Sequence, residues 1–195
     1  FEINEKAPFY LQEGCGENCY FKKGFVRKYI GIPKGITKRY QDRIKYVSGI
    51  CPIAEGIYLV SHSTPHLEQI GKNEMMYQKT KLGWKPDNFC HEQSLVLDTD
   101  SGLVIFNSCS HGGVVNIINE VKAAFPNKKI TALIGGFHIF NHPEEEIREL
   151  AKLIKETGIE RIYTGHCSKE RGYRILREEL GDMAGQFYVG MELEF

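Results

Sequence analysis

Three apolar, strand-like runs in this chain each break at glycine or serine and then present a histidine. The runs lead to His111, His138 and His166, and segments with helical spacing lie between them. This alternation of strands and helices predicts an α/β fold built in layers. Because ligands bind at the carboxyl edge of an open α/β sheet, we expect the three imidazoles to meet there.

Converging imidazoles are typical of a metal site. Neutral imidazole is the commonest nitrogen ligand of zinc and also suits iron and manganese. The sequence therefore predicts a divalent metal, zinc before iron or manganese, held by His111, His138 and His166. The alternative gives each histidine a structural hydrogen bond at the start of a loop. That alternative would be the simpler one for any single histidine, whereas the set of three favours the metal.

The turn that carries the first histidine has a second interpretation. It reads Ser108-Cys109-Ser110-His111-Gly112-Gly113 and precedes a helical segment. The Gly112 and Gly113 amides and the two serine hydroxyls would bind an anion at a helix start. A tight turn that needs glycine for its conformation alone is equally consistent. Cys109 is either a thiolate ligand or a small buried residue of the turn, and His91 is expected to line the site from the loop side.

Composition narrows the function classes. The 195 residues suit one domain, and 25 Lys+Arg balance 25 Asp+Glu, so no net field favours nucleic acid or a membrane surface. No apolar stretch is long enough to span a bilayer. The six cysteines are scattered, which indicates free thiols in a reducing cytoplasm. Cys15 and Cys19 have a metal-ligand spacing but no matching second pair.

The chain is expected to divide near residue 90. Residues 1–90 are expected to be a loop-rich basic segment, irregular over 1–50. A strand is expected at 53–60, where Glu55-Gly56 offers a turn or bulge, and a long loop at 61–90, with a short helix around Met75 and Met76 as an option within it. Basic residues interleaved with aromatic ones at 22–45 suggest either a surface for an anionic substrate or, more simply, a solvated face.

Residues 91–195 are expected to form a regular α/β half. Its turn and capping signals predict helices that begin near Val114, at Pro143 and after Ser168, the last of them ending at Leu180 before Gly181. The expected strands are 94–99 and 103–106 as a hairpin, then 130–134, 159–163 and 186–189.

The run from His91 onward resembles the second half of a metallo-β-lactamase-fold protein, in the branch of metal-dependent hydrolases and dihydropterin-ribofuranosyl-aminobenzene-phosphate-synthase-like proteins. The motifs that carry the resemblance span 107–113, 134–138 and 164–167. The resemblance implies an αββα sandwich with metal between the sheets. It places His166 at the last metal-binding histidine and His91 near the middle one. Cys109 falls where many members have a bridging Asp, His111 is the likelier ligand, and His138 would be a ligand or a substrate contact.

The chain departs from this pattern in one respect, since the leading His-x-His-x-Asp-His motif occurs nowhere in it. We therefore expect residues 1–195 to be a single, N-terminally truncated domain. The expected function is a metal-dependent hydrolase or transferase acting on a small anionic substrate, for example a phosphorylated one, with a site that is incomplete in this chain. The alternatives are a non-catalytic, self-associating α/β module and an RNA-processing relative. Partners would be a second copy or the missing N-terminal half.

Overall fold

The computed structural model describes residues 2–195 and divides the chain into two compact units. The first unit comprises residues 1–49 and 61–93, and the second comprises residues 50–60 and 94–195. None of the described helices is long and apolar enough to cross a membrane.

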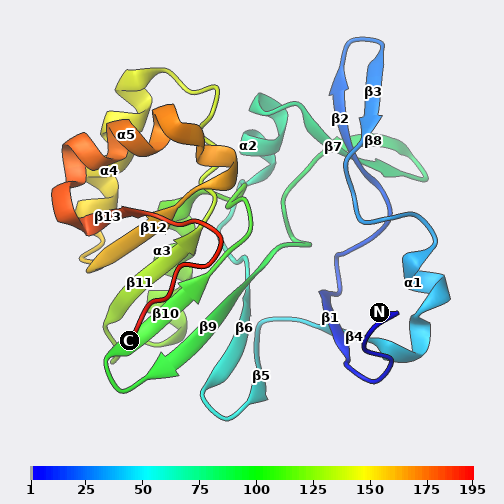
Figure 1. Ribbon diagram of the computed structural model, residues 1–195. Helices are drawn as coiled ribbons and strands as arrows, with labels where there is room; N and C mark the ends of the chain where they lie inside the picture. The colour runs from blue at the N-terminus through cyan, green and yellow to red at the C-terminus, as the bar shows by residue number, and fades with distance from the viewer. Residues whose placement is uncertain (1) are drawn as a thin grey trace. The chain divides into compact units, whose positions relative to one another are not determined.

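The first unit contains two small sheets (Figure 1). A parallel pair joins β1 to β4, and an antiparallel sheet has the strand order β3-β2-β7-β8. The elements are β1 (Phe9–Gln12), β2 (Cys19–Lys23), β3 (Val26–Tyr29), α1 (Ile36–Arg39), a 3-10 helix (Gln41–Arg43), β4 (Ile44–Val47), α2 (Glu68–Asn73), β7 (Met76–Thr80) and β8 (Gly83–Pro86).

The loop-rich prediction for the first ninety residues was wrong in detail. Residues 61–90 contain α2 and the β7–β8 hairpin rather than a long loop. The hairpin is hard to recognise because its strands are polar, and even the buried position Gln78 carries an amide. Its aromatic rings are covered by cations instead, with Lys22 over Tyr77 and Arg27 over Trp84. Such cation–π contacts stabilise a surface sheet without an apolar pattern.

The second unit is built on one seven-stranded sheet with the order β13-β12-β11-β10-β9-β6-β5. Strands β10 to β13 run parallel to one another, and β9 pairs antiparallel to β10. The elements are β5 (Ile50–Ala54), β6 (Ile57–Ser61), β9 (Gln93–Thr99), β10 (Gly102–Phe106), α3 (Val114–Ala124), β11 (Ile130–Gly135), α4 (Glu144–Glu156), β12 (Arg161–Thr164), 3-10 helices (His166–Ser168 and Gly181–Met183), α5 (Lys169–Leu180) and β13 (Ala184–Gln186).

The two faces of this sheet are covered differently. The apolar stripes of α3, α4 and α5 pack with Ile105, Leu133 and Ile162 in the main core of the unit. On the other face, Val104, Ala132 and Tyr163 lie under the C-terminal segment 187–195, drawn red in Figure 1. The helical layer on one face holds the strand ends in fixed positions, because each strand packs against a buried helix stripe.

Most expected elements of residues 91–195 are confirmed, with local differences. The hairpin, the three helices and the strands at 130 and 159 are present. Pro143 caps α4 rather than starting it. The expected strand 53–60 is the β5–β6 hairpin, because Gly56 adopts a φ of 67° and turns the chain. The last strand was misplaced, since β13 spans Ala184–Gln186 instead of 186–189.

Candidate metal centre

The three predicted histidines lie where the parallel strands β10, β11 and β12 end. His111 follows β10, His138 follows β11 and His166 follows β12. The His111 and His138 rings meet edge to face with their centroids 4.5 Å apart. The parallel pairing therefore brings side chains from separate loops to one edge of the sheet, as the sequence predicts.

Each of the three strand-end turns holds a non-glycine residue in the left-handed region. The φ angles are 54° at Ser110, 51° at His138 and 52° at His166. A left-handed backbone at an L-residue destabilises the folded state by about 1–2 kcal/mol, so three such residues at one edge together are clearly destabilising. Strain of this kind persists where the surrounding structure enforces it, and it concentrates at functional sites.

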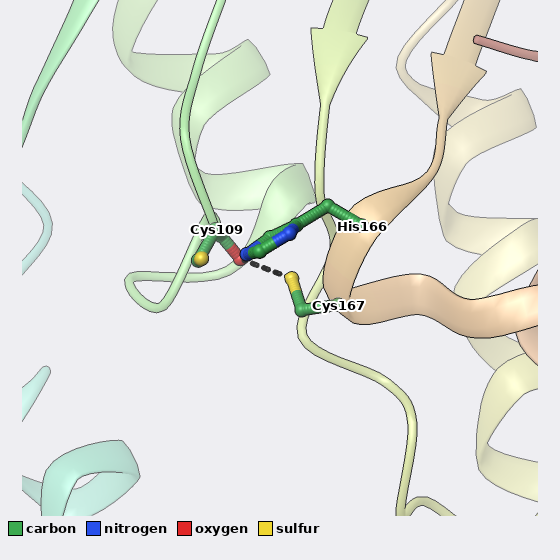
Figure 2. Close-up of side chains that lie close together, drawn as sticks. All are labelled: Cys109, His166 and Cys167. Carbon is green, nitrogen blue, oxygen red and sulfur yellow. Dashed lines mark hydrogen bonds between the residues drawn. The ribbon is translucent and has the colours of Figure 1, made fainter. Parts of the chain in front are cut away.

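Two thiols join the histidines at this edge. The Cys109 and Cys167 sulfurs and a ring nitrogen of His166 all lie within 4.8 Å of one another. Figure 2 shows the His166 and Cys167 side chains, from the turn after β12, directed at the turn after β10 that carries Cys109. The Cys167 thiol donates a hydrogen bond to the carbonyl of Cys109 at 3.8 Å. Cys167 is buried and His166 is exposed, so the group opens to solvent on the histidine side.

The electrostatics favour a thiolate at Cys109. Polar interactions with the side chains of Cys167, His111 and His138 outweigh burial and lower the pKa of Cys109 to about 2. The same hydrogen bond, together with burial and the charge on Cys109, raises the pKa of Cys167. A thiolate is the form of cysteine that binds metal, so Cys109 stands ready as a ligand.

Gly136, in the turn after β11, allows the turns after β10 and β12 to lie close together. A Cβ on Gly136 would lie 2.6 Å from the Cys167 sulfur and 3.0 Å from the Ser108 carbonyl oxygen. The Gly136 amide donates to that same oxygen at 2.7 Å. Only a residue without a side chain fits between the turns after β10 and β12.

Ser168 supports the site instead of capping α5. Its hydroxyl makes no cap hydrogen bond, which corrects the expected role. The Phe137 amide donates to Ser168 Oγ at 3.0 Å, and the Thr164 hydroxyl lies 2.5 Å from the same atom. The adjacent His138 amide donates to the Cys167 sulfur at 3.1 Å. These buried bonds fix the positions of His138 and Cys167 relative to β12.

The anion-binding interpretation of the 108–113 turn stays a prediction. The Gly113 amide is engaged within the turn, where it donates to the Ser110 carbonyl at 2.9 Å. Gly112 is buried and its carbonyl accepts from Asn116, whereas Ser108 is exposed. The buried Ser110 hydroxyl has no hydrogen-bond partner among the described residues. An anion at this turn would therefore be bound by Ser108 and Ser110 rather than by the Gly113 amide.

His91 and the basic segment lie in the first compact unit. The His91 ring lies beside Asp87 and Cys19, and its predicted role in lining the strand-end site stays a prediction. Several cations of residues 22–45 lie over aromatic rings of the same unit, for example Lys34 over Tyr29 and Lys45 over Tyr10. Packing of these cations on aromatic rings explains why basic and aromatic residues are interleaved over 22–45.

The donor set of the strand-end site fits a borderline or soft divalent cation. Thiolate sulfur and imidazole nitrogen select zinc or iron over magnesium or calcium. Sequence reasoning missed Cys167 as a member of this set. Its position directly after His166, in a turn that follows a buried strand, was the available signal.

In comparisons with known proteins, no protein-family model matches the chain. Over 109 residues the chain is 31% identical to the 7,8-dihydropterin-6-methyl-4-(β-D-ribofuranosyl)-aminobenzene-5'-phosphate synthase of Methanocaldococcus jannaschii. The matched region is 56% of the chain and 37% of that synthase, so the chain spans little more than a third of this relative.

The solved structures include a metal-dependent hydrolase of the β-lactamase superfamily that superposes with a TM-score of 0.83. The chain has the metallo-β-lactamase fold. The superposition covers 99% of the chain and 73% of the hydrolase, at 24% identity. The fold expected from the sequence is therefore confirmed, and the matched synthase is a member of the branch that the sequence resembles.

Proposed function

We propose that this chain contributes the metal centre of a metal-dependent hydrolase or transferase that acts on a small anionic, phosphorylated substrate. The observation that carries the proposal is the group of Cys109, His166 and Cys167 within 4.8 Å, beside the paired rings of His111 and His138. The metal-dependent hydrolase of like fold and the synthase, which is named for a phosphate compound, support the same class.

The residues divide into two roles in this proposal. Cys109, His111, His138, His166 and Cys167 would hold a divalent metal, with zinc favoured by the thiolate and imidazole donors. When bound, such a metal lowers the pKa of water and polarises a phosphoryl or carbonyl oxygen. The exposed Ser108 and the buried Ser110 would orient the anionic group of the substrate through their hydroxyls. A reducing cytoplasm suits this chemistry, and all six cysteines are free.

The test measures metal and activity on the same samples. The chain, and a version extended upstream in its coding sequence, are purified with Zn²⁺, and bound metal is measured by mass spectrometry beside hydrolysis of p-nitrophenyl phosphate. His166→Ala should lose metal and activity. His142→Ala is the matched control, because this histidine lies in the same unit and pairs with Glu146 instead.

Two results would overturn the proposal. An extended chain that binds no metal would remove its basis. A His111→Ala/His166→Ala variant with unchanged metal content and thermal stability would favour the non-catalytic, self-associating module, whose histidines serve structural hydrogen bonds alone. Size-exclusion chromatography of the same samples tests self-association separately.

A further inference from the structure

A second group of metal-ligating side chains lies in the first compact unit. The Cys19 sulfur, a carboxylate oxygen of Asp87 and a ring nitrogen of His91 lie within 4.8 Å of one another. Cys19 begins β2, and the other two residues follow β8, so segments far apart in the sequence supply the donors. The antiparallel pairing of β2 with β7 brings these segments together.

Asp87 is held with one oxygen directed at the group. Its Oδ1 accepts hydrogen bonds from Gln78 Nε2 at 2.8 Å and from the Phe89 amide at 2.9 Å. Its Oδ2 lies 3.1 Å from His91 Nε2, and the side chain is only 3% exposed. A buried carboxylate needs a cationic partner or a metal, and Oδ2 is the atom left to meet it.

The backbone is fitted tightly around this carboxylate. Phe89, which is fully buried, adopts a φ of 53° in the turn between Asp87 and His91. A Cβ on Gly71 of α2 would lie 2.0 Å from the Asp87 carbonyl oxygen, so no other residue fits there. The turn therefore holds the carboxylate and the imidazole in one arrangement and carries strain to do so.

His91 faces both a carboxylate and a thiol. Burial would lower the pKa of His91, but its hydrogen bonds to Asp87 and to Cys19 outweigh burial and raise it to about 11. An ordinary buried Asp–His pair requires no cysteine beside it. A carboxylate that accepts a hydrogen bond from a histidine ring is common beside protein-bound metal ions.

Two further thiols surround this group. The half-buried Cys15 and Cys90 both lie close enough to interact electrostatically, Cys15 with Cys19, Cys90 and His91. A Cβ on Gly14 would lie 2.5 Å from the Cys90 sulfur, which places that thiol against the backbone next to Cys15. Three of the six cysteines of the chain thus gather at one place, and none of them forms a disulfide.

We propose that Cys19, Asp87 and His91 bind a zinc-class divalent cation in the first compact unit. Ligand atoms of tetrahedral zinc lie roughly 3.3–3.8 Å apart, so donor atoms up to 4.8 Å apart need an adjustment of up to about 1 Å. The ion would tie the start of β2 to the segment after β8. This assignment places His91 in the present group rather than at the strand-end site.

The first test counts zinc in the full chain. The protein is purified with Zn²⁺, dialysed against a weak chelator and analysed by mass spectrometry. Cys19→Ser and Asp87→Asn should each bind about one zinc fewer than the unsubstituted chain. Cys51→Ser is the matched control, because Cys51 lies in β5 of the other unit and should leave the content unchanged. A His111→Ala/His166→Ala variant should keep this zinc, which separates the proposal from the strand-end site.

A second measurement stays informative if the substitutions prevent folding. Co²⁺ is added to a Cys109→Ser/His166→Ala chain, and the near-ultraviolet band of thiolate-to-cobalt charge transfer is recorded. The band should appear at one equivalent. No band, or unchanged zinc in both Cys19→Ser and Asp87→Asn, would overturn the proposal. So would a Cys15–Cys19 disulfide, or rapid iodoacetamide labelling of Cys19 in zinc-loaded protein.

Discussion

Replacing Gly136 by Ala tests how tightly the strand-end site is packed. The new Cβ would lie 2.6 Å from the Cys167 sulfur and 3.0 Å from the Ser108 carbonyl oxygen. Ordinary contact needs about 3.5–4.0 Å, so the sulfur must move by about 1 Å. That sulfur is short-tethered and accepts a hydrogen bond from the His138 amide, so it cannot swing away freely. We expect Gly136→Ala to destabilise the second unit by about 1–3 kcal/mol.

A double-mutant cycle isolates this contact. Cys167→Ala removes the sulfur, so Gly136→Ala should cost less by about 1 kcal/mol in that background, with the Ser108 contact remaining. Urea unfolding followed by circular dichroism, in the presence of chelator, gives the four free energies. Costs that add within about 0.5 kcal/mol would refute the packing argument. Gly158→Ala is the control for general destabilisation, because its φ of 72° strains any residue other than glycine although a Cβ there meets nothing within 4 Å, and it should leave zinc content unchanged.

Three further substitutions test the account by urea unfolding and zinc content. Ser110→Gly should raise the free energy of unfolding by about 1 kcal/mol, since it relieves a left-handed residue and removes a buried hydroxyl without a partner. A lower free energy of unfolding would argue against strain at Ser110. Ser168→Ala should cost about 1–3 kcal/mol by leaving the Phe137 amide and the Thr164 hydroxyl without their partner, and a neutral result would contradict this. Ile154→Ala should cost about 2–5 kcal/mol in the main core yet leave the zinc content of folded protein unchanged, so metal loss there would argue against a locally held site.

The strand-end histidines were predictable because their signal is local. Each follows a short apolar run, and the parallel order of the strands then brings them to one edge. Cys167 was not predicted, because its position after His166 indicates a strand-end turn but not which of the two adjacent residues turns toward the Cys109 loop. Its orientation depends on Gly136 and on the hydrogen bond from the His138 amide, which only the assembled turns define.

The first unit was less predictable because its stability does not come from apolar periodicity. Its polar hairpin is covered by cation–π contacts, and these depend on pairing between β2 and β7. The group of Cys19, Asp87 and His91 arises from the same pairing. A spacing rule sees Cys15 and Cys19 but cannot supply donors that lie far away in the sequence.

The measurement that tests the central claim most directly is the metal content of the chain with and without its strand-end donors. The unsubstituted protein and His142→Ala should bind the same amount of zinc, whereas Cys109→Ser and His166→Ala should each bind less while keeping the folded circular dichroism spectrum. Equal zinc in all four proteins would contradict the metal centre at this edge.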